Sequence, residues 1–551
     1  MKKLLLVVIF ILIVTDISAQ ANDWIWAEGA GDISNDYSNA VCTDASGNVY
    51  ATGTFQASSI TFGNYTLYNA GTGHLDIFVV KYDASGNVLW AKSGGGTGDD
   101  YAYGICADAN ENVFITGFFR PPSLTLGTIT LTNADSTGFN FDIFTAKYDS
   151  AGNLLWAKSE PNPGSELCYG ICTDSNGDVY ITGAFGYQTN FIFGNYTLIT
   201  RGYYDLFIAK YDSDGNVLWA KNAGGTQADG GQAICADASG NVYVTGYFQY
   251  QAIFGSDTIH GNGNVNVFLA KYDTHGNNLW AKSATGPAYS IGIGYGITAD
   301  QGGKVYITGY FAYSVIFGSD TLGNSGYSIF TAKYDTSGNA LWGRSPGGTN
   351  LDYGTSISAD AYGNVFVTGY FASSFLNFGG IPVLNANVGY NDIFVAEYDG
   401  SGNALWATGV GGPDYDYGMG ICASTSGDVY VTGYFGSYSV NFGNITLINN
   451  GSYDIFLAKL GSYTGIEENY SQASCSVFPN PSTGQFTVYS SSLKVGCTMA
   501  IYNVTGEKIY SQNISNYNNN QMPINLKLNK GVYFIQLING QQTITKQIVV
   551  E

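Results

Sequence analysis

A phrase centred on tryptophan recurs along most of the chain and constrains its fold more than any other feature. Residues 82–92 read YDASGNVLWAK, and five later copies differ from this phrase at only a few positions. The anchoring tryptophans follow one another at intervals of 61 to 66 residues: Trp26, Trp90, Trp156, Trp219, Trp280, Trp342 and Trp406. Seven units of nearly constant length predict one repeat architecture instead of several unrelated domains.

Each unit contains two more signatures, a run ending in Thr-Gly-x-Phe and a run similar to DIFTAKY. Both alternate with period two, which indicates strands with one buried face. Asp-x-x-Gly-Asn sequences supply the turns, because Asp accepts turn amides and Gly adopts positive φ. Each unit therefore gives four main strands, and four-stranded sheets repeated radially are the blades of a β-propeller.

A half-copy of the phrase, WIWAEG, stands alone at residues 24–29, whereas the last unit stops at DIFLAKLGS without a tryptophan strand. Pairing the first segment with the last unit closes the ring and leaves no half-sheet edge. A linear solenoid, the competing architecture, does not explain the stranded half-copy. The prediction is an all-β protein with a seven-bladed β-propeller over residues 20–461, closed by its N-terminal strand.

The two ends of the chain carry different signals. Residues 1–19 combine Lys2 and Lys3, an apolar run and a small-residue exit, the layout of a secretory signal peptide. No other stretch is apolar for long enough to cross a bilayer, so we expect an exported protein that is not transmembrane. A net charge of −21 repels phosphate backbones, which argues against a nucleic-acid partner.

Composition changes after a linker at residues 462–474. Residues 475–551 contain six or seven short strand patterns separated by turns, which predicts a small β-sandwich. Cys475 and Cys497 either form a disulfide in the exported compartment or stay free, because sequence does not give their separation.

Two family resemblances follow from these motifs. The units resemble the SBBP (seven-bladed β-propeller) repeats of secreted bacterial proteins. Residues 475–551 resemble the type A C-terminal sorting domain of type IX secretion in the Bacteroidetes, which implies the secretion machinery as a partner. It also implies release, or attachment to surface polysaccharide with removal of this domain. The matching positions are Phe478, Pro479, Asn480, Pro481, Gly506, Gly531 and Tyr533.

One repeat position, at the start of the inner strand, is acidic in six units and is Gly292 in the fifth. We expect these residues to form a ring at the channel mouth. They could hold a cation such as Ca²⁺ or steer a basic ligand. Alternatively, each carboxylate accepts backbone amides from its own loop, an interpretation that the strict repetition favours. The six residues are Asp36, Asp100, Glu166, Asp229, Asp352 and Asp416.

Loops between the second and third strands vary in length, whereas the Asp-Gly turns do not, so these loops are candidates for recognition. Tyr203, Tyr204 and Tyr390 offer flat rings for a glycan or protein ligand, although Tyr also simply suits strand edges. The chain has three histidines and no recognisable nucleophile or metal-protease motif. The prediction is a surface binding or adhesion module without enzymatic activity or a required cofactor. The alternative is a carbohydrate-active hydrolase that uses an acidic pair at the channel mouth.

Overall fold

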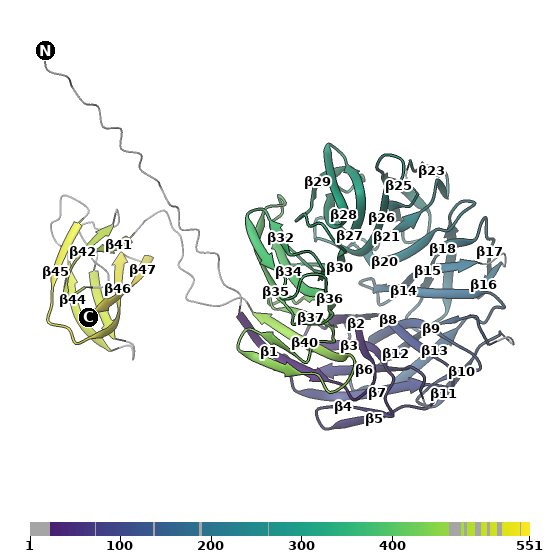
Figure 1. Ribbon diagram of the computed structural model, residues 1–551, viewed down its shortest axis with the longest axis horizontal. Coiled ribbons are helices and arrows are strands. Elements are labelled where there is room, and N and C mark those ends of the chain that lie inside the picture. Colours follow the sequence, from purple (N-terminus) through teal and green to yellow (C-terminus); the bar gives the residue numbers. More distant parts are fainter. Residues whose placement is uncertain are drawn as a thin grey trace, which may run out of the picture. The chain divides into compact units, whose positions relative to one another are not determined.

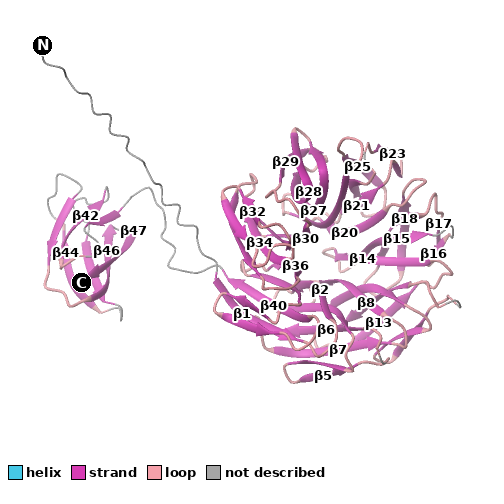
Figure 2. Cartoon of the chain, viewed as in Figure 1, coloured by secondary structure: helices cyan, strands magenta, loops and turns pink. Residues whose placement is uncertain are grey.

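The computed structural model describes residues 23–461 apart from 72, 136–137, 187–189 and 263, and then 475–478, 482–490, 498–503, 507–514, 521–539 and 542–550. The chain divides into two compact units, one ending at Tyr463 and the other beginning at Thr464. The described residues form strands, turns and loops without any helix (Figure 2). The all-β class is therefore confirmed. The predicted signal peptide and linker lie outside the described residues.

Seven antiparallel sheets of four main strands succeed one another along the first unit (Figure 1). The first three contain β2 (Asp36–Thr43), β3 (Val49–Phe55), β6 (Asp76–Tyr82) and β7 (Val88–Gly95); β8 (Asp100–Ala107), β9 (Val113–Phe119), β12 (Asp142–Tyr148) and β13 (Leu154–Ser159); β14 (Ser165–Thr173), β15 (Val179–Gly186), β18 (Tyr204–Tyr211) and β19 (Val217–Ala223). The next three contain β20 (Gly230–Ala236), β21 (Val242–Phe248), β24 (Asn266–Tyr272) and β25 (Asn278–Ala284); β26 (Ile291–Ala299), β27 (Val305–Phe317), β28 (Asp320–Tyr334) and β29 (Ala340–Arg344); β30 (Asp352–Ala359), β31 (Val365–Phe371), β34 (Asp392–Tyr398) and β35 (Ala404–Val410). The seventh contains β36 (Asp416–Ala423), β37 (Val429–Phe435), β40 (Asp454–Gly461) and β1 (Asp23–Ala30).

The first strands of the sheets contact one another in a closed cycle. β2 contacts β8, and the contacts continue through β14, β20, β26, β30 and β36 back to β2. The seventh sheet takes its outer strand from the other end of the chain, because β1 pairs antiparallel with β40 and places Trp26 opposite Lys459. The predicted N-terminal pairing is thus present, and it joins the first sheet of the chain to the last.

Residues of the repeated tryptophan phrase contact the neighbouring sheet. The indole of Trp26 donates a hydrogen bond to the carbonyl of Ala84, 3.1 Å away, in the turn of the first sheet. Gly86 in that turn has a φ of 89°, and a Cβ there would lie 3.0 Å from the Trp26 ring. The glycine therefore serves both the turn and the neighbouring indole, which explains why the two parts of the phrase recur together.

Short hairpins account for the FGNYTL-like stretches. In the second repeat, β10 pairs with β7 of the first sheet, so the hairpin of β10 and β11 extends that sheet. In the fifth sheet the hairpin is continuous with β27 and β28. The separate hairpins are β4 (Ser59–Phe62) with β5 (Tyr65–Tyr68), β10 (Ser123–Leu126) with β11 (Ile129–Thr132), β16 (Phe191–Phe193) with β17 (Tyr196–Leu198), β22 (Gln251–Phe254) with β23 (Asp257–His260), β32 (Phe375–Phe378) with β33 (Ile381–Leu384) and β38 (Ser439–Phe442) with β39 (Ile445–Ile448).

The second unit consists of two small sheets that share one core. Three strands form the first sheet and four form the second. Val488 of the first sheet and Met499, Ile535 and Ile548 of the second are buried together. The strands are β41 (Cys475–Phe478), β42 (Gln485–Ser490) and β45 (Gln521–Asn525), and then β43 (Thr498–Asn503), β44 (Lys508–Asn513), β46 (Gly531–Asn539) and β47 (Gln542–Val550).

Candidate functional site

The six acidic residues of the repeat are fully enclosed instead of lining an open mouth. Each has a relative exposure of 0%, so the expected ring of exposed carboxylates at the channel mouth is corrected. In four units the carboxylate accepts hydrogen bonds from its own loops. Asp352, for example, accepts the amide of Ala372 at 3.1 Å and the hydroxyl of Ser373 at 2.6 Å. The other three of this kind are Asp36, Asp229 and Asp416.

A second carboxylate, from the start of the third strand in the preceding sheet, lies beside most of these acids. The amide of Asp100 donates to the carbonyl of Leu75 at 2.7 Å, which places Asp100 next to Asp76. Burial, and then the charge of Asp76, raise the pKa of Asp100 to about 9. Neighbouring sheets form five such pairs: Asp454 with Asp36, Asp76 with Asp100, Asp142 with Glu166, Asp205 with Asp229, and Asp392 with Asp416.

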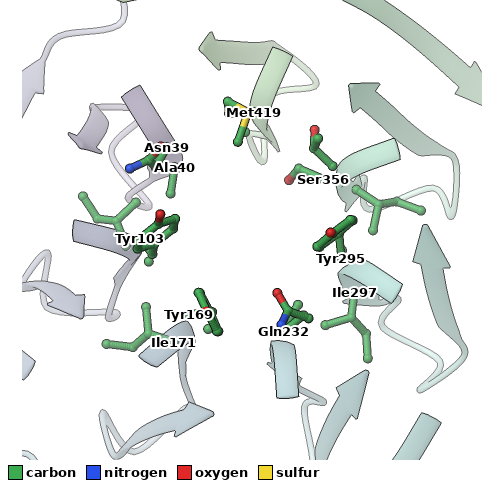
Figure 3. Close-up of a pocket in the computed structure, with 18 of the residues that line it drawn as sticks. Asn39, Ala40, Tyr103, Tyr169, Ile171, Gln232, Tyr295, Ile297, Ser356 and Met419 are labelled. Carbon is green, nitrogen blue, oxygen red and sulfur yellow. The ribbon is translucent and has the colours of Figure 1, made fainter. Parts of the chain in front are cut away.

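The central channel holds a cavity of about 580 Å³ between the first strands (Figure 3). Every first strand has a bulge at the same place, for instance between Ser38 and Ala40 in β2. The bulged residue lines the cavity, and a bulge commonly re-aims one side chain out of the regular alternation. These seven residues, each three positions after the buried acid or its equivalent, are Asn39, Tyr103, Tyr169, Gln232, Tyr295, Thr355 and Met419.

The cavity lining is aromatic and polar but carries no side-chain charge among the residues that border it. The rings of Tyr103 and Tyr169 meet edge to face, with centroids 5.5 Å apart. Burial, and then the neighbouring Tyr101, raise the pKa of Tyr103 to about 12, so its hydroxyl stays protonated. Asn39 in the first sheet donates its side-chain amide to the carbonyl of Ala102 in the second sheet at 2.8 Å, and this hydrogen bond fixes its orientation.

Sequence reasoning missed this cavity. The available signal was a position that holds five different residue types in seven units, whereas the position two residues later is Val or Ile in every unit. Without knowledge of the bulge, alternation alone does not place that position in the channel.

The three loop tyrosines do not form one site. Tyr203 is 57% exposed and borders a shallow cavity of about 470 Å³ with Arg201 and Thr226. Tyr204 is the first residue of β18 in the third sheet. Tyr390 lies before β34 of the sixth sheet, where its ring packs on Tyr415 with centroids 4.8 Å apart. Two sheets separate these groups around the cycle, so a small ligand cannot contact both.

No group of three or more His, Cys, Asp or Glu suited to a metal occurs within the part of the chain that the structure describes. Nor do the described residues include a helix long and apolar enough to cross a membrane.

Some positions of the sorting motif are visible in the second unit. Gly531 begins β46, and the buried Tyr533 donates its hydroxyl to the carbonyl of Asn529 at 2.9 Å. Phe478 ends β41. Pro479, Asn480, Pro481, Gly506 and Cys497 lie outside the described residues, as does the side chain of Cys475. The Cys475–Cys497 disulfide therefore stays a prediction.

Comparison with known families places residues 476–551 in the secretion system C-terminal sorting domain. Proteins with this domain leave the cell by type IX secretion, so the chain is an exported protein that is secreted or held on the cell surface. It follows that the type IX machinery is a partner of this domain. The match does not extend to the seven sheets.

Two curated proteins resemble a larger part of the chain. An uncharacterised WD repeat-containing protein of Acanthamoeba polyphaga mimivirus is 24% identical over 533 residues, covering 80% of this chain and 38% of the relative. The regulatory protein FlaEY of Caulobacter vibrioides is 23% identical over 390 residues, covering 64% of this chain and 38% of the relative. The chain thus matches well under half of the length of either relative.

Solved structures give weaker likenesses. PorZ, a surface component of the type IX secretion system of Porphyromonas gingivalis, matches 95% of this chain and 75% of its own at 12% identity and a TM-score of 0.31. A Synechocystis apocarotenoid oxygenase matches 71% of this chain and 97% of its own at 11% identity and a TM-score of 0.29. Neither TM-score is high enough to indicate a shared fold.

Deletion of residues 475–551 should leave the seven sheets folded but stop their passage through the outer membrane, because the sorting domain is a separate compact unit. Cell fractionation and protease accessibility of intact cells would measure this. As a control, fusion of the same residues to an unrelated periplasmic reporter should carry the reporter out. Normal surface amounts of the truncated chain would contradict the prediction.

Proposed function

We propose that residues 20–461 form a seven-bladed β-propeller of the SBBP type that acts outside the cell as a binding or adhesion module, with its ligand in the central cavity. The closed cycle of first strands and the pairing of β1 with β40 support this architecture. The first strands of a propeller surround one channel, and seven strands can contribute side chains to a ligand there.

The non-repeating lining of the cavity is the observation that carries the proposal. Residues that only hold the sheets together repeat from unit to unit, as the threonine of Thr-Gly-x-Phe does: it is buried in every sheet and donates to a third-strand carbonyl. The seven bulged positions instead hold three tyrosines, two amides, a threonine and a methionine. A symmetric scaffold with an asymmetric lining is what recognition of an asymmetric ligand requires.

The chemistry of the lining favours an uncharged ligand with both apolar faces and hydroxyl groups, such as a segment of neutral glycan. Tyrosine rings can pack on the apolar face of a sugar. The amide of Gln232 and the hydroxyl of Thr355 can each donate and accept hydrogen bonds. The cavity provides no carboxylate pair of the kind a glycosidase uses, so it lends no support to a hydrolase.

A glycan array probed with the propeller tests the proposal, and variants of the cavity then locate the site. Tyr169→Ala and Gln232→Ala should each weaken binding to the best glycan by about tenfold or more, because the first removes a large aromatic contact and the second a hydrogen-bonding amide. Tyr362→Ala is the control, since this tyrosine is 89% exposed in the turn between β30 and β31. If Tyr203→Ala and Tyr390→Ala abolish binding while the cavity variants keep it, the loops hold the ligand and the cavity proposal is wrong.

A further inference from the structure

In two of the five carboxylate pairs, on either side of the second sheet, the first-strand acid has no hydrogen-bond donor on either oxygen, whereas the first-strand acids of the other three pairs each accept at least two hydrogen bonds. At the first, Asp76 accepts the amide of Ala70 through Oδ2, while its Oδ1 and both oxygens of Asp100 have no hydrogen-bond partner. The amide of Gly96 is near enough to lower the pKa of Asp100, but it is not in hydrogen-bond geometry. Asp76 and Asp100 are 1% and 0% exposed. Both side chains are therefore enclosed by protein, and bulk water does not reach them to supply the missing hydrogen bonds.

The sequence of the second sheet explains why Asp100 lacks the donors found elsewhere. In the first, fourth and sixth sheets, the residue after the second strand donates its amide to the acid, as Gln56 does to Asp36 at 3.2 Å. In the second sheet this residue is Arg120, whose amide donates only to the carbonyl of Asp99, whereas the amides of Gln56 and Ala372 each donate both to the equivalent carbonyl and to the acid. The next two residues are Pro121 and Pro122, which have no N–H to offer.

The pair on the other side of the second sheet combines Asp142 with Glu166. Both oxygens of Glu166 are fully buried without a hydrogen-bond partner. Asp142 accepts the amide of Ala134 at 2.9 Å and makes a long contact of 3.5 Å with the amide of Asn162. Glu166 donates its own amide to the carbonyl of Phe141, which holds the two acids on facing strands.

A buried carboxylate without a partner is expensive, by several kcal/mol for each ion, so each pair needs a counter-ion or a proton. None of the described Lys, Arg or His side chains makes an ion pair with Asp76, Asp100, Asp142 or Glu166. Near the first pair, His74 and Arg120 both face Asp99. Two further acids add negative charge, Asp99 beside Asp100 and Asp135 beside Asp142. Among the described residues, therefore, no side chain supplies the counter-ion, and the charge of each pair is neutralised by a proton or by a cation from solution.

We propose that each of these pairs, Asp76 with Asp100 and Asp142 with Glu166, binds one Ca²⁺ ion. Calcium prefers carboxylate and carbonyl oxygens and accepts six to eight of them at about 2.3–2.6 Å, so two carboxylates with loop carbonyls and water suit it. Extracellular modules typically bind calcium with dissociation constants of about 10⁻⁴ to 10⁻³ M, which fits an exported chain. Each ion joins the third strand of one sheet to the first strand of the next.

Calcium binding to the full chain tests the proposal directly. After treatment with a chelator and dialysis, equilibrium dialysis with radioactive calcium should give two bound ions per chain. Asp100→Asn and Glu166→Gln should each remove one ion, or weaken its site at least about tenfold. Asp352→Asn is the matched control, because Asp352 occupies the same strand position but already has three hydrogen-bond donors. This control should keep both ions.

Thermal unfolding gives a second measurement that does not depend on the variants. Calcium should raise the melting temperature of the stripped chain, and magnesium should raise it less because it requires a tighter octahedral site. A stripped chain that binds no calcium overturns the proposal, as does equal binding by Glu166→Gln and Asp352→Asn. If the melting temperature responds to acid but not to calcium, the pairs share protons and the calcium sites do not exist.

Discussion

A chain that lacks β1 is expected to unfold at a clearly lower urea concentration than the intact chain. The deletion removes Trp26 from the interface with the first sheet, where its indole donates to Ala84 and covers Gly86. It also exposes the edge of β40, which pairs with β1 along its length. Truncation of one large buried aromatic side chain costs about 3–5 kcal/mol, so the deletion should cost at least this much.

The side-chain part of this effect can be isolated by Trp26→Ala. Ile25→Ala serves as its control, because Ile25 lies in the same strand and is 53% exposed; its effect should stay within about 0.5 kcal/mol. Urea titrations followed by circular dichroism would compare the unfolding midpoints. An unchanged midpoint for the chain without β1 would mean that other contacts close the cycle.

Closure of the cycle could be predicted because the repeated phrase encodes a contact between units. A tryptophan from one sheet packs against the turn glycine of the next, so a tryptophan segment without its own unit indicates a neighbour elsewhere in the chain. The strand order follows from the period-two pattern and the constant turns. These are local or nearest-neighbour properties, and a repeat displays each of them several times.

The direction of side chains in the first strands could not be predicted in the same way. The bulge between Ser38 and Ala40, repeated in all seven first strands, shifts the alternation. Asp36 consequently points into the interface between sheets, and Asn39 points into the channel. A bulge leaves no residue-type signature here, because the seven bulged positions hold five different residue types. The sequence therefore places the acids on the correct strand, and of its two interpretations the structure agrees with loop donors at four of the six acids and not with a ring open at the channel mouth.

The partner acids cannot be recognised from the sequence for a related reason. Asp76 opens the DIFVVKY run, and a strand-opening aspartate is usual beside a turn. Its proximity to Asp100 depends on how neighbouring sheets pack, which the pattern within one unit does not contain. The first-strand acid of a pair takes hydrogen-bond donors from amides in the loop after the second strand. Only the structure shows that Pro121, which has no amide hydrogen, lies in this loop just beyond Phe119, the residue paired with Asp100.

Without calcium, the stability of the chain should fall as the pH rises from about 5 to about 9. Burial, and then the charges of Asp76 and Asp142, raise the pKa of Asp100 and of Glu166, each to about 9. Burial raises the pKa values of Asp76 and Asp142 to about 6. The folded state therefore binds these protons more tightly than the unfolded state, and its stability declines as they are lost. The turn aspartates act in the opposite direction but at lower pH: at Asp83, desolvation is outweighed by hydrogen bonds from Asn87, which lower its pKa.

Urea titrations in a chelator at several pH values would measure this slope, and a loss of at least about 2 kcal/mol between the ends of the range is expected from even one pair. Glu166→Gln should make the profile less steep without abolishing the slope, because the neutral amide has no charge to desolvate while Asp100 and other buried acids still titrate. Tyr362→Ala should leave the profile unchanged. Millimolar calcium should restore stability at the alkaline end, where the carboxylates are ionised and ready to bind the cation. A flat profile in the chelator would contradict the prediction. It would mean that the folded state stabilises the ionised carboxylates as well as water does, although Asp100 and Glu166 have no hydrogen-bond donors around them.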